Sequence, residues 1–195
     1  MSLSSEQVHW IGGAATVVVA VSLLLREAGI VSNRRLDWLL PVFLALYGME
    51  SFVDPWVHGT AIPAHYGSES SQHVIQGSAM LAAGIVEALI LYGALNSRAW
   101  LAVLPAALVV LGLVFLFHAE HGASVPPLVI QVQHRAFALT LLVAAATRAL
   151  LLLPGQGAKT LASGWLILLL LFGLELLTYT EHGSQTMMHG GRSGS

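Results

Sequence analysis

Six long apolar runs dominate the sequence, and each is close to the roughly 20 residues that a helix needs to cross a bilayer. They cover about residues 8–25, 36–53, 73–95, 99–118, 130–153 and 161–180. Because backbone N–H and C=O groups find no water in hydrocarbon, such runs are expected to form helices. The alternating segments of about ten residues that build a transmembrane β-barrel are not seen. We therefore predict an all-α integral membrane protein with six transmembrane helices.

The composition agrees with a lipid bilayer as the main partner. Hydrophobic residues make up 56% of the chain and charged residues only 9%, whereas a soluble domain carries about 25% charged residues. A net charge of −2 argues against nucleic acid, which requires a basic surface. The absence of cysteine excludes disulfides and thiolate metal sites. Since MSLSSEQVHW lacks a basic region, we expect the first run to be retained as a span and not cleaved as a signal peptide.

Two short patterns recur at matching places along these runs. A histidine followed by glycine closes a pair of runs in HGTAIP (58–63), HGASVP (121–126) and EHGS (181–184). A glutamine just before a histidine opens the next pair, as in Gln7 with His9, Gln72 with His73, and Gln133 with His134. The opening and closing histidines are 49, 48 and 48 residues apart. A fixed period with matching ends is typical of an internal repeat.

We therefore expect three tandem helical hairpins, over about 8–59, 73–122 and 133–183. Together they form a single transmembrane domain, 1–183. The remaining residues, 184–195, are rich in glycine and serine and are expected to form a flexible tail.

The positive charges predict how the hairpins cross the membrane. Six of the eight Lys and Arg residues fall in or near the connections within hairpins: Arg26, Arg34, Arg35, Arg98, Arg148 and Lys159. By the positive-inside rule these connections are cytoplasmic, so both termini lie outside the cytoplasmic (inner) membrane. All nine histidines then fall at the outer, periplasmic face.

Several imidazoles and carboxylates at one face predict a metal site, because neutral histidine is the commonest protein metal ligand. Imidazole with carboxylate suits copper, iron or zinc, and the Irving–Williams order favours Cu(II). Copper is therefore the expected cofactor, for metal handling or redox chemistry, with a periplasmic redox or metal-carrying partner. The candidate ligands are His58, His73, His118, His121, His134 and His182, supported by Asp54, Glu120 and Glu181.

Helix dipoles predict different roles for the two kinds of histidine. His73 and His134 are expected at helix N-termini, where positive potential disfavours the imidazolium and leaves a neutral ligand. His118, His121 and His182 are expected at C-termini, which favour protonation unless a metal displaces the proton.

Two other functions remain open from the sequence. A b-type haem protein serving electron transfer would need facing histidines, such as His73 with His134 or His118 with His182, and a cleft lined by small residues. An accessory subunit of a larger membrane complex would carry the histidines without using them. The residues name no substrate and leave open whether the chain is an enzyme.

Charged residues inside the apolar runs are costly and mark function by default. Glu87 and Arg148 each lie 14 residues after an opening histidine, which predicts a structural ion pair between the third and fifth spans. Glu50 and Glu175 lie below the closing histidines and are expected to carry protons to them or to hold them.

Overall fold

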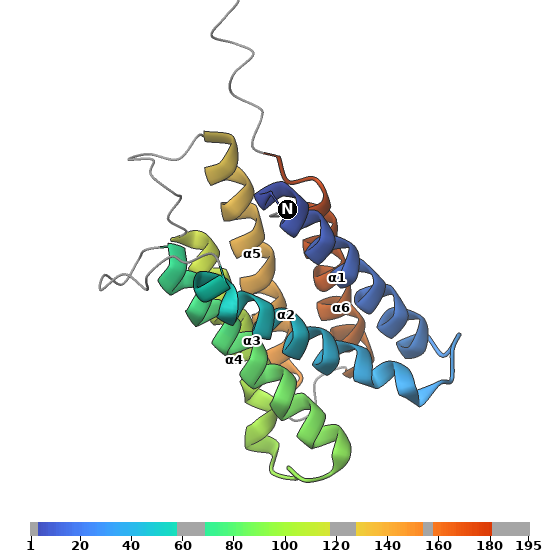
Figure 1. The fold of residues 1–195 in the computed structure, drawn as a ribbon. Coiled ribbons are helices and arrows are strands. Elements are labelled where there is room, and N and C mark those ends of the chain that lie inside the picture. Colours follow the sequence, from blue (N-terminus) through green and yellow to red (C-terminus); the bar gives the residue numbers. More distant parts are fainter. Residues whose placement is uncertain (1–3, 58–68, 118–127, 154–157, 181–195) are drawn as a thin grey trace, which may run out of the picture.

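The computed structural model describes residues 4–57, 69–117, 128–153 and 158–180, and within these ranges all regular structure is helical (Figure 1). Six α-helices and two short 3-10 helices follow one another along the chain. They are α1 (Ser5–Glu27), η1 (Arg34–Trp38), α2 (Leu39–Val57), α3 (Glu69–Tyr92), η2 (Arg98–Ala102), α4 (Val103–Leu116), α5 (Leu128–Leu150) and α6 (Ala158–Leu177).

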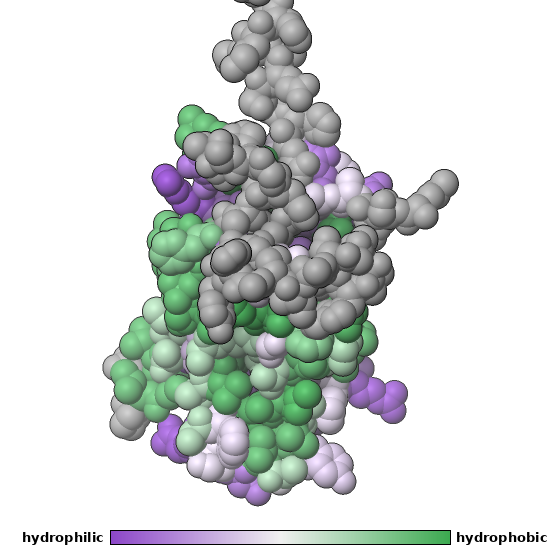
Figure 2. Space-filling view, turned by 60° about the vertical axis from the view of Figure 1, so that its left-hand side comes forward, coloured by the Kyte–Doolittle hydropathy of each residue, from purple (hydrophilic) through white to green (hydrophobic). Residues whose placement is uncertain are grey.

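In the described part of the chain, six helical segments are long and apolar enough to cross a membrane, which confirms the predicted all-α class. Many large hydrophobic side chains are exposed on the outside of the bundle, and most of them are leucines, isoleucines and valines. Figure 2 shows hydrophobic residues over the middle of the face that is drawn, and hydrophilic residues toward both ends. This distribution indicates a lipid bilayer environment.

The odd-numbered helices all begin at one end of the bundle (Figure 1). His9, His73 and His134 lie within the first two turns of α1, α3 and α5, so we call this the histidine end. The connections from α1 to α2 and from α3 to α4 lie at the opposite end, which we call the turn end.

The most extensive helix contacts join α2 to α3, α1 to α6 and α4 to α5, followed by α5 to α6 and α3 to α4. Helices α1 and α2 make few contacts with each other. The closest partners are thus helices of different predicted hairpins, and α1 packing on α6 brings the last helix back against the first.

Small residues face each other at these three closest crossings. A methyl group built on Gly13 would lie 2.8 Å from the Gly173 carbonyl oxygen, and one on Gly48 would lie 2.9 Å from that of Gly77. A methyl group on Gly112 would lie 3.2 Å from the Ala138 carbonyl oxygen. Small residues let helix backbones approach in lipid, where packing replaces the hydrophobic effect as the driving force.

The two connections at the turn end are built alike. Gly29 and Gly93 adopt φ of 74° and 84°, a left-handed conformation in which glycine ends a helix without strain. In each case the next two amides donate to one helix carbonyl, that of Leu25 or Leu89. A capping side chain, Asn33 or Ser97, then accepts from a backbone amide and opens a 3-10 helix.

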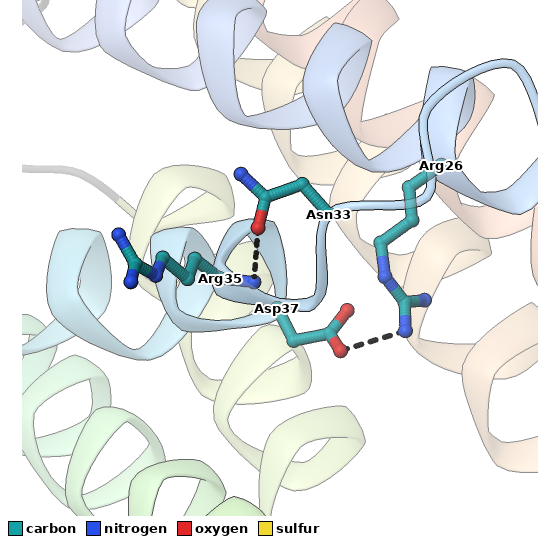
Figure 3. A network of polar contacts seen from close by, with 4 residues as sticks. All are labelled: Arg26, Asn33, Arg35 and Asp37. Atoms are coloured by element: carbon teal, nitrogen blue, oxygen red, sulfur yellow. Dashed lines mark hydrogen bonds and ion pairs between the residues drawn. The ribbon is translucent and has the colours of Figure 1, made fainter.

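Each 3-10 helix leads directly into a transmembrane helix with proline as its third residue, Pro41 in α2 and Pro105 in α4. Proline is tolerated there because the amides of the first turn have no helical acceptor. The first connection is also held by an ion pair of 2.7 Å between Arg26 and Asp37, next to the Asn33 cap (Figure 3).

Some predicted helix ends were wrong. We expected the second span to stop at Asp54-Pro55, but α2 continues to Val57. A proline in the last turn of a helix removes only one backbone hydrogen bond, so it did not mark the end. Helices α3 and α5 begin before the apolar runs, at Glu69 and Leu128, because polar residues extend a helix beyond the hydrocarbon.

Replacing Gly77 by alanine should lower the free energy of unfolding by about 1–3 kcal/mol, the usual cost of overpacking. The added methyl would collide with the backbone of Phe52. The matched control is Gly164→Ala, whose methyl would meet Thr147 at an ordinary 3.5 Å and should be neutral or stabilising. Unfolding by SDS in mixed micelles, followed by circular dichroism, measures both. Equal changes in stability in the two variants would contradict the role of close backbone approach at the crossing of α2 with α3.

Candidate functional site

Two histidines from α1 and α5 and a tyrosine just beyond α6 meet at the histidine end. The His9 ring of α1 stacks on Tyr179, just beyond α6, with centroids 3.9 Å apart and planes 18° apart. The His134 ring of α5 lies 5.7 Å from Tyr179 and 6.2 Å from His9. His134 and Tyr179 are 6% and 3% exposed, so the cluster lies inside the bundle.

The backbone around this cluster is fixed by hydrogen bonds. The Trp10 indole N–H donates to the Tyr179 carbonyl at 2.9 Å, which ties the end of α6 to α1. The His9 Nδ1 lies 2.8 Å from the Ser5 carbonyl one turn earlier. If Nδ1 carries the proton and donates there, the Nε2 lone pair is the one that can bind a metal.

Phenylalanine rings enclose the cluster toward the middle of the bundle. Phe115, Phe137 and Phe172 contact one another edge to face, with centroids 5.5–6.0 Å apart, an arrangement that the ring quadrupoles favour. Phe115 and Phe137 each lie 5.8 Å from the His134 ring. His134 therefore has an apolar wall on its inner side.

The glutamines that precede the opening histidines tie two helix pairs together. Gln133 donates to the Thr180 carbonyl at 2.9 Å and accepts from the Thr180 amide at 3.0 Å. Gln72 donates to the Phe117 carbonyl at 2.7 Å. In both cases the start of an odd-numbered helix is fastened to the chain just beyond the following even-numbered helix. This contact gives the recurring glutamine a physical role.

The predicted ligands are placed as follows. His134 joins the cluster described above, and its neighbour there is His9, which we did not include in the metal set. His73 lies half-buried in the second turn of α3. Asp54 lies in the last turn of α2, with its side chain outside the described part. The remaining candidates lie outside the described residues: His58, His118, His121, His182, Glu120 and Glu181.

Within the part of the chain that the structure describes, no three His, Asp or Glu side chains come together as a metal site would require. The His9 and His134 pair is what the described residues contribute. Tyr179, which joins the two rings, was missed because a tyrosine at the end of an apolar run is typical of a membrane-interface anchor.

We expected the helix dipole to act on the opening histidines, which requires that they lie at helix N-termini. Helix α5 begins at Leu128 and α3 at Glu69, so His134 and His73 lie in the second turn of their helices. The helix dipole acts mainly within the first turn, so these two side chains do not lie where that prediction assumed.

One partly buried acid, Glu175, lies below the cluster. The Thr140 hydroxyl of α5 donates to Glu175 Oε1 of α6 at 2.8 Å, and Glu175 Oε2 is also shielded from solvent. Glu175 lies one helical turn before Tyr179. It thus joins α5 to α6 beneath the two imidazoles.

The predicted ion pair between the third and fifth spans is confirmed. The guanidinium of Arg148 lies 3.9 Å from the carboxylate of Glu87, and it also lies over the Trp165 ring at 5.2 Å. Both charged side chains are mostly buried, at 22% and 12% exposure. Pairing lowers the cost of placing each charge inside the membrane.

Comparison of the chain with protein-family models, with curated proteins and with solved structures gives no significant match.

Removing one partner of the Glu87–Arg148 pair should cost more than removing both. Arg148→Met would leave Glu87 buried without its cation, and breaking a buried pair in this way typically costs about 3–5 kcal/mol. The double variant Glu87→Leu/Arg148→Met should recover most of that stability. Unfolding of the single and double variants in SDS mixed micelles measures the difference. Equal stability of Arg148→Met and of the double variant would show that the ion pair contributes nothing.

Proposed function

We propose that this chain is a membrane protein of three tandem helical hairpins that binds a transition-metal ion, copper, at the histidine end, for metal handling or redox chemistry. The observation that carries the proposal is the pair of hydrogen bonds from Gln72 to Phe117 and from Gln133 to Thr180. The hairpin repeat, the ligand set, the metal and the orientation are each supported by separate observations.

Matching residues support the repeat. A small residue follows each opening histidine by four positions, at Gly13, Gly77 and Ala138. A glycine follows by 39 positions, at 48 (48−9), 112 (112−73) and 173 (173−134). These are the residues that face each other at the three closest helix crossings. Equivalent residues of the three hairpins thus make equivalent contacts.

The glutamine contacts support the ligand set. Gln72 directly precedes His73, and its partner Phe117 directly precedes His118. Gln133 directly precedes His134, and its partner Thr180 directly precedes Glu181, which is followed by His182. In two hairpins, therefore, the glutamine before the opening histidine binds a backbone group at the end of the following even-numbered helix. The closing histidine follows a few residues later in the sequence. Successive residues are only about 3.8 Å apart along the chain.

We propose that His134 is the central ligand, with His9 beside it. The other ligands come from His73, His58, His118, His121 and His182, with Asp54, Glu120 and Glu181 as carboxylate ligands or hydrogen-bond partners of the imidazoles. A site of imidazoles and carboxylates without thiolate favours Cu(II) among the available divalent ions.

The orientation follows from the distribution of positive charge. Arg26, Arg34, Arg35 and Arg98 lie at the turn end, which we place in the cytoplasm by the positive-inside rule. The histidine end and both termini then face the outside of the cytoplasmic membrane. A soluble metal carrier or redox protein on that side is the proposed partner.

Elemental analysis and visible absorption of the detergent-purified protein, never exposed to chelator, test the proposal. We expect copper bound stoichiometrically in the wild type and lost in His134→Ala. Gln133→Leu should weaken binding by about tenfold or more, as expected when a residue that positions a ligand is lost. His65→Ala, which changes a histidine outside the proposed set, is the control and should bind normally.

Three results would contradict the proposed copper site. A Soret band would establish the haem alternative, in which His9 and His134 are candidate axial ligands. Copper retained fully by a folded His134→Ala variant would place the site elsewhere. Protein free of metal and haem that copurifies with other membrane proteins would instead favour an accessory subunit.

A further inference from the structure

A cleft opens between α1 and α2, the pair of sequence neighbours with the fewest mutual contacts. The two helices diverge from their shared turn toward the histidine end (Figure 1). The cleft has a volume of about 300 Å³ and is lined by Ile11, Gly12 and Ala15 of α1 and by Phe43, Leu46, Tyr47 and Glu50 of α2. This volume is at the small end of the range for ligand sites.

The cleft faces the lipid and not the centre of the bundle. Ile11 and Leu46 are 56% and 69% exposed, and both lie on spans that are apolar enough to cross the membrane. A molecule dissolved in the bilayer can therefore enter the cleft directly from the side.

One carboxylate lies in this apolar cleft. Glu50 is the polar member of the lining besides the Tyr47 hydroxyl, and it is exposed. A carboxylate on a lipid-facing helix surface is costly and by default marks function. Whatever its protonation state, at least one of its oxygens accepts hydrogen bonds.

In the third hairpin, a hydrogen bond joins the two helices at the position that corresponds to the cleft. Glu50 lies 41 residues after His9 (50−9), and Glu175 lies 41 after His134 (175−134). There, the Thr140 hydroxyl donates to Glu175 and joins α5 to α6. The residue of α1 that corresponds to Thr140 is Ala15, since each lies six positions after its histidine (15−9 and 140−134).

The first hairpin thus has an acid, Glu50, at the position of Glu175, but it has the methyl group of Ala15 in place of the Thr140 hydroxyl. The cleft lies at this position. In the second hairpin the acid is replaced by Val114 (114−73 = 41), which is buried. Among the three equivalent positions, the acid faces a lipid-accessible cleft in the first hairpin.

Aromatic rings form the wall beside Glu50. Phe43 and Tyr47 lie with their centroids 5.7 Å apart and their planes 21° apart. The Tyr47 hydroxyl lies against Gly12, where an added methyl would approach it to 2.8 Å. The wall provides a ring face for stacking, and the Tyr47 hydroxyl lies beside Gly12, which also lines the cleft.

We propose that this cleft binds a membrane-soluble hydroxylated aromatic molecule of the hydroquinone class. Its hydroxyl donates to Glu50 in place of the threonine hydroxyl of the third hairpin, its ring packs on Phe43 and Tyr47, and its apolar tail extends past Leu46 into the lipid. The proposal uses the correspondence between hairpins but is independent of the metal site.

Binding of tritiated decylhydroquinone to the full chain in lipid nanodiscs tests this, under argon, after subtraction of partitioning into empty nanodiscs. We expect saturable binding with one site per chain. Glu50→Leu should weaken it by about tenfold or more, because leucine cannot accept the hydrogen bond from the hydroquinone hydroxyl. Decylbenzene carrying methoxy groups in place of both hydroxyls should compete poorly, because it retains the ring and tail but donates nothing.

A second pair of variants keeps the test independent of folding defects. Ala15→Thr restores the hydroxyl that the third hairpin uses, so it should engage Glu50, close the cleft and weaken binding by about tenfold or more. Thr140→Ala makes the reverse change at the equivalent position of α5 and should leave hydroquinone binding unchanged.

Equal binding in wild type, Glu50→Leu and Ala15→Thr would overturn the proposal, as would equal competition by the methoxy compound, which would indicate an apolar groove only. Absence of saturable binding, together with a copurifying membrane protein that Glu50→Leu releases, would also overturn it and assign the cleft to a partner helix. Loss of copper in His134→Ala bears on the metal proposal alone.

Discussion

Close approach of helix backbones is the constraint on which this bundle depends. In lipid, two apolar helices gain little from the hydrophobic effect when they meet, so packing distance decides which pairs hold together. Gly13 with Gly173, Gly48 with Gly77, and Gly112 with Ala138 provide that approach at three crossings. The first of these crossings brings α6 onto α1, and in doing so it places Tyr179 over His9. The candidate site at the histidine end therefore depends on glycines located deeper in the membrane.

Side-chain hydrogen bonds then distinguish the three proposed hairpins. The helices α5 and α6 are joined by Gln133 with Thr180 and by Thr140 with Glu175, and α3 is joined to the chain after α4 by Gln72. In α1 the corresponding glutamine, Gln7, instead forms a capping box with Ser4. The extent of helix packing within the proposed hairpins follows the same order: it is greatest between α5 and α6, smaller between α3 and α4, and least between α1 and α2. A site for a lipid-soluble ligand arises where the joining contacts are replaced.

The helical spans and the Glu87–Arg148 pair could be predicted from the sequence. Hydropathy is read directly along the chain, and a charged residue inside an apolar run needs a partner of opposite charge. The choice of closest neighbours could not, since it depends on which faces of the helices carry their glycines and on how loops direct the chain. Likewise, His134 was predicted as a ligand, but its proximity to His9 and Tyr179 comes from the crossing of α1 with α6. Helix ends were misjudged at Pro55, His73 and His134 for one reason: an apolar run marks where the hydrocarbon ends and not where the helix ends. Most of the predicted ligands lie outside the described residues, so the metal set as a whole stays a prediction.

The contact of α6 with α1 also bears on the connectivity of the fold. Thr180 donates to Glu6 at 3.1 Å, and Trp10 donates to the carbonyl of Tyr179, so the last described helix ends beside the beginning of the first. Helix α6 meets α1 through small residues just as α2 meets α3 and α4 meets α5. The crossing of α1 with α6 forms between the two described helices that lie farthest apart along the chain. The bundle is in this sense circular: the last described helix closes onto the first through the same kind of small-residue contact that joins α2 to α3 and α4 to α5. Closure of the bundle therefore depends on packing in the membrane and not on adjacency along the chain.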